Sequence, residues 1–288
     1  EWRINKMKLP FKINLENKVC VVTGAGGVIC SHLARALAQC GAKVALLDLN
    51  KDAAEVFAKE IREEGNIAYA YEANVLKKES LEKCHNEILK DLGKCDILIN
   101  GAGGNNPRAT TDNEYAKLDD EVKGIKTFFD LDEAGVEFVF NLNFIGTLLP
   151  TQVFACDMVG RQDCSIMNIS SMNAFTPLTK IPAYSGAKAA ISNFTKWLAV
   201  HFSHVGIRCN AIAPGFFVTK QNEKLLYNED GTPTPRTGKI LASTPMGKFG
   251  NVDDLVGATL FLCSGEAAGF VTGVVLPIDG GFSSYSGV

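Results

Sequence analysis

Short apolar runs recur along the chain, and polar stretches separate them at fairly even intervals. Seven of these runs, each five to eight residues long, are "KVCVVT" (18–23), "KVALLD" (43–48), "IAYAYE" (67–72), "DILIN" (96–100), "SIMNIS" (165–170), "IRCNAIA" (207–213) and "VTGVVLPI" (271–278). Several are apolar throughout, which is typical of strands that are covered on both faces. The pattern therefore predicts seven strands.

Helical patterns lie between these runs. In "HLARALAQCG" alanine and leucine repeat at helical spacing, and Gly41 follows as a stop signal. Strands that alternate with helices indicate a mainly parallel sheet with right-handed crossovers. We expect one α/β domain over residues 1–288: a Rossmann-type doubly wound sheet of about seven mainly parallel strands flanked by helices, with residues 1–14 as an N-terminal extension.

Two long polar segments interrupt the alternation. Residues 104–133 follow the strand that ends at Asn100, and residues 214–250 follow the strand that ends near Ala213. Both leave the carboxyl ends of strands, where open α/β sheets bind their ligands. We interpret both segments as substrate-side loops, with surface decoration as the alternative.

Composition narrows the class of protein. The chain has 288 residues, of which 46% are apolar and 21% are charged, and its net charge is −3. This balance suits a soluble globular protein with a large core, and it argues against a nucleic-acid binder, which needs a basic excess. No apolar stretch approaches the ~20 residues that cross a bilayer, so we expect no membrane partner.

The cysteines and histidines give no pattern of a metal site. Nine cysteines are spread singly, without a C-x-x-C pair, and we interpret them as buried, reduced thiols of a cytoplasmic protein. His201 and His204 lie three apart near a predicted helix end, but no acidic or cysteine partner stands beside them. We therefore interpret them as ordinary histidines and predict no metal.

The stretch "TGAGGVIC" (23–30) follows the first predicted strand and precedes the first predicted helix. A bound dinucleotide requires this order of a strand, a tight glycine turn and a helix whose first N–H groups face the pyrophosphate. Gly24, Gly26 and Gly27 would let the backbone approach phosphate oxygens. Val28 and Cys30 stand where the pattern T-G-x-x-x-G-x-G has glycine, but those glycines chiefly serve helix packing, and slender residues can replace them.

Asp48 ends the second predicted strand. A carboxylate there can accept hydrogen bonds from both ribose hydroxyls of the adenosine half, and it repels a 2′-phosphate. We therefore predict NAD (NADH) as the cofactor, with NADP as the less favoured one. The alternative role of Asp48 is to cap the helix that follows.

The stretch "NISSMNAFTPLTKIPAYSGAKAAISNF" holds a candidate acid–base group. Tyr184 and Lys188 lie four apart on a predicted helix, so both side chains project from one face. An ammonium beside a phenol lowers the pKa of the phenol from its usual value of ~10. Ser171 lies thirteen residues before Tyr184, at a strand end, where its hydroxyl can donate to the same substrate oxygen.

With these residues in place, the chain resembles the short-chain dehydrogenase/reductase family over nearly its whole length, from about Leu15 onward. The N-N-A-G segment of the family appears as "NGAG" (100–103), with Gly101 in place of the second asparagine. The helix asparagine of the family matches Asn143, and its P-G-x-x-x-T motif matches Pro214, Gly215 and Thr219. The aspartate that the family usually has near the adenine is replaced by Asn74, which should alter the adenine contacts.

The resemblance implies a role for each matched residue. Tyr184 would be the general acid in ketone reduction and the base in alcohol oxidation, while Lys188 would tune it and hold the nicotinamide ribose. Ser171 would polarise the substrate oxygen, Asn143 would support a water-linked proton relay, and Thr219 would fix the carboxamide. The implied cofactor-binding residues are Thr23, Gly24, Gly26, Gly27, Val28, Ile29, Asp48, Asn74, Val75, Asn100, Gly101, Ala102, Gly103, Tyr184, Lys188, Pro214, Gly215, Phe217 and Thr219.

Within the family, the segments "NGAGGNNPRATT", "KTFFDLD" and "APGFFVTKQN" are similar to bacterial D-mannonate oxidoreductases (fructuronate reductases), which interconvert a sugar-acid ketone and alcohol with NAD. A hydroxylated acid needs polar donors and a cation near its carboxylate. The loop residues that could supply them are Asn105, Asn106, Arg108, Asn173, Lys180, Lys220 and Gln221. Nothing in the sequence selects one of the cations.

Three other functions remain open from the sequence. A gluconate 5-dehydrogenase-like or other polyol dehydrogenase is the first alternative, and a 3-oxoacyl reductase is less favoured. From a different class, an NAD(H)-sensing regulator would have the same fold without catalysis, but intact Tyr184 and Lys188 argue against it. The resemblance also implies a homo-oligomer, a tetramer or dimer, paired through the apolar faces of the helix around Pro150 and of residues 184–204.

Overall fold

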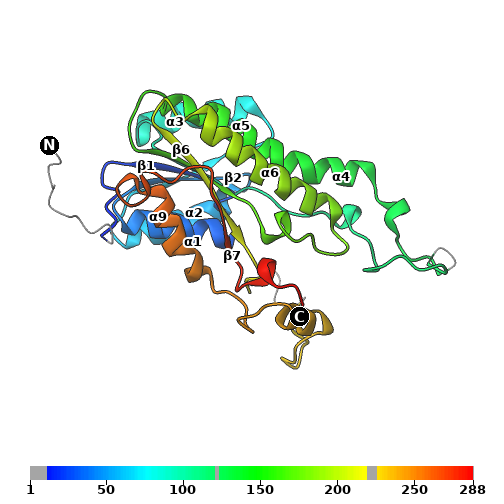
Figure 1. Ribbon diagram of the computed structural model, residues 1–288. Coiled ribbons are helices and arrows are strands. Elements are labelled where there is room, and N and C mark those ends of the chain that lie inside the picture. Colours follow the sequence, from blue (N-terminus) through cyan, green and yellow to red (C-terminus); the bar gives the residue numbers. More distant parts are fainter. Residues whose placement is uncertain (1–11, 121–122, 219–225, 288) are drawn as a thin grey trace.

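Seven parallel strands form one sheet in the computed structural model of the chain, which describes residues 12–120, 123–218 and 226–287 (Figure 1). The strands are β1 (Val19–Thr23), β2 (Lys43–Asp48), β3 (Ala68–Glu72), β4 (Ile97–Asn100), β5 (Cys164–Ile169), β6 (Ile207–Pro214) and β7 (Val275–Ile278). Their order is β3-β2-β1-β4-β5-β6-β7, and each neighbouring pair is parallel. The predicted Rossmann-type sheet is confirmed.

The apolar runs become strands because the sheet is covered on both faces. β1, β4 and β5 are buried along their whole length, whereas the edge strand β3 alternates and leaves Tyr69 exposed. The sequence pattern predicted that the last strand begins at Val271, but β7 begins at Val275. The reason is a turn at Gly273, which has φ of 80° and donates its N–H to Cys209 O at 2.7 Å.

Helices form a layer on each face of the sheet (Figure 1). α1 (Val28–Gln39), α2 (Lys51–Glu63) and α9 (Val256–Cys263) pack on one face, and α3 (Lys78–Asp91), α5 (Gly146–Phe154) and α6 (Pro182–His201) pack on the other. The remaining α-helices with given bounds are α4 (Glu133–Phe140), α8 (Pro235–Ala242) and α10 (Gly265–Ala268). Each layer buries leucine and isoleucine side chains completely, such as Leu37 of α1 and Ile88 of α3.

One long helical segment covers the second face. α4 continues through a π-helical turn (Asn141–Ile145) into α5, and the segment ends at Asp157. Glu133–Asp157 is 25 residues long, and its most apolar window has a mean hydropathy of 1.3. By length and composition alone it could span a membrane, although no such segment was expected from the sequence. Half of that window is buried inside the fold, and α5 packs against α3, as a core helix does.

The two substrate-side segments begin at the same edge of the sheet, after β4 and after β6. The first contains 3₁₀ turns at Pro107–Ala109 and Phe128–Asp130, and the second contains α8. Lys239 Nζ of α8 donates to both carboxylate oxygens of Glu114, at 2.8 and 2.9 Å. This ion pair joins the two segments.

Candidate active site

A glycine turn joins β1 to α1 at the carboxyl edge of the sheet. Gly24 has φ of 68°, a conformation that suits glycine, and a Cβ on it would lie 2.9 Å from the Ala102 backbone. Gly27 is the N-cap of α1, and none of the described side chains caps the helix there. The first N–H groups of α1 are therefore available to an anion.

Asp48 braces this turn from the end of β2. Its Oδ2 accepts the Gly26 N–H at 2.9 Å, and its Oδ1 accepts the Asn50 N–H at 2.9 Å. A Cβ on Gly26 would lie 3.0 Å from Asp48 Cγ, so a side chain there would push the carboxylate out of its present position. Asn50 caps α2 by accepting the Ala53 N–H at 3.2 Å. The helix-capping role considered for Asp48 therefore belongs to Asn50.

Thr23 and Asn100 support the site from within the sheet. The buried Thr23 Oγ1 accepts the N–H groups of Gly101 at 3.1 Å and Ala102 at 3.3 Å, which connects β1 to the loop after β4. The buried Asn100 Nδ2 donates to Thr151 Oγ1 at 3.0 Å and to Asn168 Oδ1 at 2.9 Å. Both residues hold neighbouring elements together beneath the cavity.

A cavity of about 740 Å³ lies between the glycine turn and the ends of β2, β3, β4 and β6. The predicted cofactor residues that line it are Gly24, Gly27, Val28, Ile29, Asp48, Asn74, Val75, Gly101, Ala102, Gly103, Gly215 and Phe217. Thr23, Gly26, Asn100, Tyr184, Lys188 and Pro214 are not among its lining residues, and Thr219 lies outside the described residues. Its size is within the usual range for a ligand site.

The cavity also has lining residues that the sequence motifs did not indicate: Cys30, Leu49, Ala73, Leu76, Phe138, Leu142 and Phe216. Leu49 and Ala73 directly follow the ends of β2 and β3, so their place after a strand was a usable signal. Phe138 and Leu142 reach the cavity from the long helical segment, and no spacing in the sequence indicates that. The free helix end, the close glycines and the Asp48 carboxylate together fit a dinucleotide.

The end of β5 and the start of α6 bring Ser171, Tyr184 and Lys188 together. Ser171 is 8% exposed, its hydroxyl accepts the Asn173 N–H at 3.2 Å, and it lies near enough to the Tyr184 phenol to lower the pKa of that group. Lys188 follows Tyr184 by one helical turn, and its Nζ lies 5.6 Å from the centroid of the tyrosine ring. The same Nζ donates to Ile169 O at 2.8 Å, so the amine is held at the end of β5.

Burial governs the pKa values of both ionisable groups. It raises the pKa of the Tyr184 phenol, and the nearby Ser171 hydroxyl acts in the opposite direction. It lowers the pKa of the Lys188 amine to about 8, with the Cys30 thiol acting in the opposite direction. In contrast to the sequence expectation, the effect that lowers the pKa of the phenol comes from Ser171 and not from Lys188.

Asn143 lies in the π-helical turn and is fully buried. Its Nδ2 donates to Gly104 O at 2.8 Å and to Val139 O at 2.7 Å, and its Oδ1 accepts the Gly104 N–H at 3.2 Å. A Cβ on Gly103 would lie 2.6 Å from Asn143 Oδ1 and 3.2 Å from Lys188 Nζ. The loop after β4 therefore lies between Asn143 and the amine, and the candidate catalytic side chains are close together.

The proposed substrate contacts are at several different places. Asn105 Nδ2 donates to Thr110 Oγ1 at 3.1 Å, and the exposed Arg108 is already paired with Asp132. Asn106 Oδ1 accepts the Arg108 N–H at 2.9 Å. Asn173 is buried next to Ser171, and its Oδ1 has no hydrogen-bond partner among the described residues. Lys180 has φ of 71°, and its backbone carbonyl accepts the Thr111 N–H at 2.9 Å. Lys220 and Gln221 lie outside the described residues.

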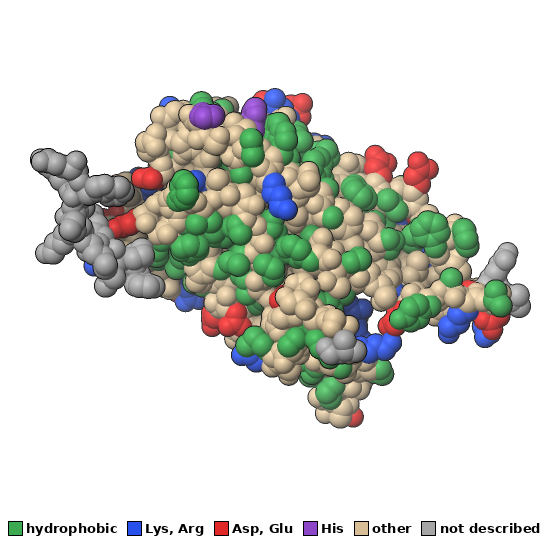
Figure 2. Space-filling model, viewed as in Figure 1, with side chains coloured by type: hydrophobic (Ala, Val, Ile, Leu, Met, Phe, Trp, Pro, Cys, Tyr) green, Lys and Arg blue, Asp and Glu red, His purple; other side chains and the backbone are tan. Residues whose placement is uncertain are grey.

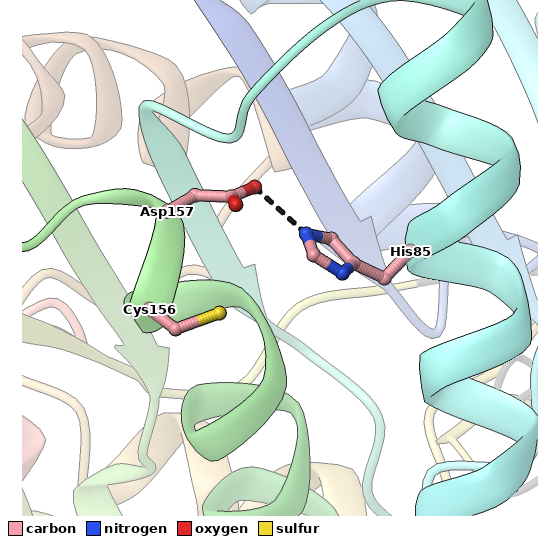
Figure 3. Close-up of side chains that lie close together, drawn as sticks. All are labelled: His85, Cys156 and Asp157. Atoms are coloured by element: carbon pink, nitrogen blue, oxygen red, sulfur yellow. Dashed lines mark hydrogen bonds and ion pairs between the residues drawn. The ribbon is translucent and has the colours of Figure 1, made fainter.

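Away from the cavity, His85, Cys156 and Asp157 converge (Figure 3). Their candidate ligand atoms lie within 4.8 Å of one another, although no sequence spacing indicates the group. Asp157 Oδ2 lies 2.9 Å from His85 Nε2 and accepts the Cys95 N–H at 3.0 Å, so the carboxylate fixes α3 against the end of the long helical segment. His201 is one of the two histidines whose spacing was compatible with a metal site. Its ring stacks on that of Trp197, with 4.5 Å between the ring centroids.

Comparison with known sequences identifies a family. The family model for short chain dehydrogenase matches residues 18–230. An uncharacterized oxidoreductase of Haemophilus influenzae is 63% identical over 282 residues, which cover 98% of this chain and 99% of the relative.

Solved structures agree with this match. A Haemophilus influenzae protein provisionally assigned as a D-mannonate oxidoreductase, with bound NAD, has a TM-score of 0.93 at 64% identity, and the match covers 96% of this chain and 98% of that one. A gluconate 5-dehydrogenase from Burkholderia cenocepacia, in complex with NADP and tartrate, has a TM-score of 0.80 at 30% identity, with 95% and 98% covered. The protein therefore belongs to the short-chain dehydrogenase family and is an oxidoreductase that acts on alcohols.

Proposed function

We propose that this oxidoreductase interconverts the ketone and alcohol of a sugar acid, D-fructuronate and D-mannonate, with NAD. The observation that carries the proposal is the group of Ser171, Tyr184 and Lys188 next to a cavity with the features of a dinucleotide site. The substrate is supported by the 64% identical structure whose provisional assignment is D-mannonate oxidoreductase. We assign this activity to one domain that spans residues 1–288, in which residues 1–14 are an N-terminal extension. We propose that the protein acts in the cytoplasm.

Asp48 supports NAD over NADP. Its carboxylate lines the cavity at the end of β2 and braces Gly26, so its position is fixed by two backbone N–H groups. A ribose with free hydroxyls can donate to this carboxylate, whereas a 2′-phosphate would be repelled by it. The bound NAD in the 64% identical structure agrees with this preference.

We assign the remaining cofactor contacts to residues in and around the cavity. The turn residues Gly24, Gly26, Gly27, Val28 and Ile29 would present backbone N–H groups to the pyrophosphate. Asn74 and Val75 would face the adenine, and Gly101, Ala102 and Gly103 would lie along the middle of the cofactor. Pro214, Gly215 and Phe217 would border the nicotinamide, with Thr23 and Asn100 as supports, and Thr219, outside the described residues, would hold the carboxamide.

Proton transfer belongs to Tyr184. Nicotinamide, when bound, supplies or takes the hydride, and the chain's own residues position the substrate and move the proton. Tyr184 donates its phenolic proton to the ketone oxygen in reduction and accepts a proton from the alcohol in oxidation. Ser171 donates a hydrogen bond to the same oxygen. The effect of Ser171 on the pKa of the Tyr184 phenol supports this assignment, because it requires the two hydroxyls to be near each other.

Lys188 and Asn143 have supporting roles in this proton transfer. Lys188, whose Nζ lies 5.6 Å from the centroid of the tyrosine ring, would hold the nicotinamide ribose. The tuning of the phenol that the family resemblance implies for this amine is absent from the effects on the pKa of Tyr184, where Ser171 lowers it instead. Asn143 fixes the Gly104 backbone through its side-chain amide, and we assign to it the support of a water-linked proton relay. Lys188 and Asn143 are both buried.

The two substrate-side segments, 104–133 and 214–250, form the walls around the sugar acid. Asn173 is the best-supported contact, because its buried Oδ1 is free to accept a sugar hydroxyl. Asn105, Arg108, Lys180, Lys220 and Gln221 are the other candidates. Arg108 would have to exchange its Asp132 partner for a substrate carboxylate.

The specific alternative is a gluconate 5-dehydrogenase-like activity. A gluconate 5-dehydrogenase from Gluconobacter oxydans is 32% identical over 277 residues, and the structure with NADP and tartrate is another of this kind. Gluconate is also a hydroxylated acid, so both activities need the same type of site. The identity to these proteins is about half that to the Haemophilus influenzae structure.

A substrate panel distinguishes these functions. Purified protein is assayed by NADH absorbance with D-fructuronate, 5-keto-D-gluconate and a simple keto ester, and each assay is repeated with NADPH. We expect the highest kcat/KM with D-fructuronate and NADH. A higher kcat/KM with 5-ketogluconate would replace the proposed substrate by the alternative. Tight NADH binding without turnover of any ketone would make the protein a nucleotide sensor.

We further propose that the protein is a homo-oligomer, a dimer or tetramer, built on the apolar faces of α6 and of the long helical segment Glu133–Asp157, which contains Pro150. Trp197 is 55% and Val200 is 76% exposed on α6, and Phe138 and Phe140 are exposed on α4. Figure 2 shows apolar side chains over this part of the surface. A second copy with the same face would cover them, because a two-fold axis brings identical patches together.

A further inference from the structure

Two positions that line the cavity differ from the family pattern: one has a side chain where the pattern has glycine, and the other has glycine where the pattern has a side chain. Cys30 stands where T-G-x-x-x-G-x-G has glycine, so this position has gained a side chain. Gly101 stands where N-N-A-G has asparagine, so that position has lost one. The two residues belong to different elements, since Cys30 is in the first turn of α1 and Gly101 follows β4.

The structure brings these two positions into contact. A Cβ placed on Gly101 would overlap the Cys30 Sγ and would lie 2.9 Å from Thr23 O. It would lie 3.6 Å from the Cys30 Cβ, which is an ordinary contact. Cys30 is 5% exposed, so its thiol has little room to turn away. The thiol therefore occupies the space that a side chain at position 101 needs.

Space, and not backbone conformation, explains the glycine at this position. Gly101 does not have a positive φ, unlike Gly24 in the opposite turn. Gly103 in the same loop is tight against Asn143 Oδ1, whereas a Cβ on Gly104 would meet only Leu142 Cδ2, at 3.8 Å. The tightness at Gly101 has its own source, the thiol and the end of β1.

The contact lies across the cavity proposed for the dinucleotide. Cys30 and Gly101 both line it, and Thr23 holds the Gly101 N–H from beneath. The distance between the N-terminus of α1 and the loop after β4 is therefore set by what fills the space between these two residues. Burial raises the pKa of the Cys30 thiol to about 12, so it is neutral and fills space without carrying charge.

We propose that Cys30 and Gly101 are a coupled positioning pair, in which the thiol of one replaces the missing side chain of the other and fixes the width of the cofactor cleft. The proposal rests on the proposed function in one respect, that the cleft binds NADH. It requires position 101 to tolerate a side chain only when position 30 gives up its sulfur. Overpacking of a tight site is destabilising when neither neighbour can move.

A double-variant cycle tests the coupling. Gly101→Ala is made in the wild type, in Cys30→Ala and in Cys30→Ser, and the NADH Kd, the KM and kcat, and the thermal midpoint without NADH are measured. We expect Gly101→Ala to weaken NADH binding about tenfold in the wild type and in Cys30→Ser, with KM raised more than kcat is lowered. In Cys30→Ala the same change should weaken binding clearly less, by about threefold, because the overlap with the thiol is gone and only the contact of the new Cβ with Thr23 O, at 2.9 Å, remains. Gly257→Ala, a glycine in α9 with open space around it, should leave the NADH Kd unchanged.

Each other outcome has a definite meaning. An equal loss of affinity from Gly101→Ala in all three backgrounds would overturn the pair, as would no loss in the wild type. If Gly101→Ala does not fold alone, recovery of the thermal midpoint in Cys30→Ala supports the proposal, and failure to recover refutes it. If the wild type binds no NADH, the proposed function fails, and the thermal midpoints still decide whether the two positions are coupled.

Discussion

Lys188 is a buried amine at the centre of the candidate site. It is 3% exposed, and burial lowers its pKa from 10.5 to about 8, so the folded protein binds this proton less tightly than the unfolded chain does. Between these two values the unfolded chain carries more protons than the folded protein, and stability rises with pH. Below about pH 8 the full destabilisation by the charged amine is present. The residue proposed to assist catalysis therefore reduces the stability of the fold.

Replacing this amine should make the protein more stable and inactive. We expect Lys188→Met to raise the free energy of unfolding by about 2 kcal/mol at about pH 7, after allowance for the lost hydrogen bond to Ile169. The difference should shrink as the pH rises from about 8 to 10.5. Urea unfolding at several pH values measures it, with Lys196→Met, an exposed position on the same helix, as the control. A variant that is less stable than the wild type at every pH would contradict the expectation.

Tyr184 should be dispensable for binding and essential for turnover. We expect Tyr184→Phe to lower kcat by about 10³-fold or more, because the proton donor is lost, while NADH binds within about threefold of the wild-type Kd. Stopped-flow and fluorescence titration separate the two quantities. Tyr69→Phe, at an exposed position on β3, should change neither. Retention of a tenth or more of wild-type kcat would show that another group moves the proton.

Asp48 carries two functions that one pair of substitutions can separate. Asp48→Asn removes the charge and keeps one oxygen acceptor, so only one of the Gly26 and Asn50 N–H groups keeps its partner. We expect NADPH to gain at least about tenfold in kcat/KM relative to NADH, with a loss of stability smaller than that of Asp48→Ala. Asp48→Ala should relax the preference similarly and also lose about 1–2 kcal/mol of stability, because two backbone donors lose their acceptor. A wild-type enzyme that already prefers NADPH would refute the role assigned to this carboxylate.

At the scale of elements, the π-helical turn Asn141–Ile145 determines where Asn143 points. A π-helical turn inside an α-helix widens it locally, and such turns are frequent at functional sites. Here the widened turn directs a buried amide at both the Val139 carbonyl and the Gly104 backbone. The second face of the sheet and the loop after β4 are therefore joined through one side chain.

Removing that side chain should affect both stability and catalysis. We expect Asn143→Ala to lose about 2–4 kcal/mol of stability, because the Gly104 and Val139 groups lose their partners in a buried place. We expect kcat to fall by about tenfold or more as well. Asn141→Ala, in the same turn but with only a weak bond to Glu137 at 3.3 Å, is the matched control. Equal losses from both variants would mean that the turn matters and the Asn143 amide does not.

The elements differ in how far the sequence predicts them. Period and composition placed six strands within a residue of their observed bounds. Strands buried on both faces must be apolar along their length, and the edge strand β3 shows the alternation of a half-covered strand instead. The four-residue spacing likewise placed Tyr184 and Lys188 on one helical face. The π-helical turn and the Gly273 turn that delays β7 were not predicted, since each depends on contacts with residues far away in the chain.

For the molecule as a whole, the alternation of strands and helices was sufficient to predict the sheet, and the sheet places the site. Parallel strands put the ends of β1, β2, β4, β5 and β6 on one edge, so residues that follow those strands converge there. The sequence could not predict what these ends contact across the edge. The bracing of Gly26 by Asp48 and the contact of Cys30 with Gly101 exist only in three dimensions.

The exposed helix faces make the assembly testable. We expect the wild type to be a dimer or tetramer by light scattering, and Trp197→Glu to shift it toward smaller species by placing a charge in the buried face. Val56→Glu changes an apolar residue that is 57% exposed on α2, on the other face of the sheet, and should leave the assembly unchanged. A wild type that is monomeric at all concentrations would refute the proposed interface.

The nine cysteines are all unpaired, and seven are buried, with Cys156 exposed and Cys40 between the two. Burial raises the pKa values of those interior thiols, which suppresses their reactive thiolate form while the chain is folded. Unfolding by heat or denaturant would expose all nine thiols to dissolved oxygen and to the thiols of other unfolded chains. Mispaired crosslinks would then trap the opened chains, so the lifetime of the protein in oxidising solution depends on how rarely it opens.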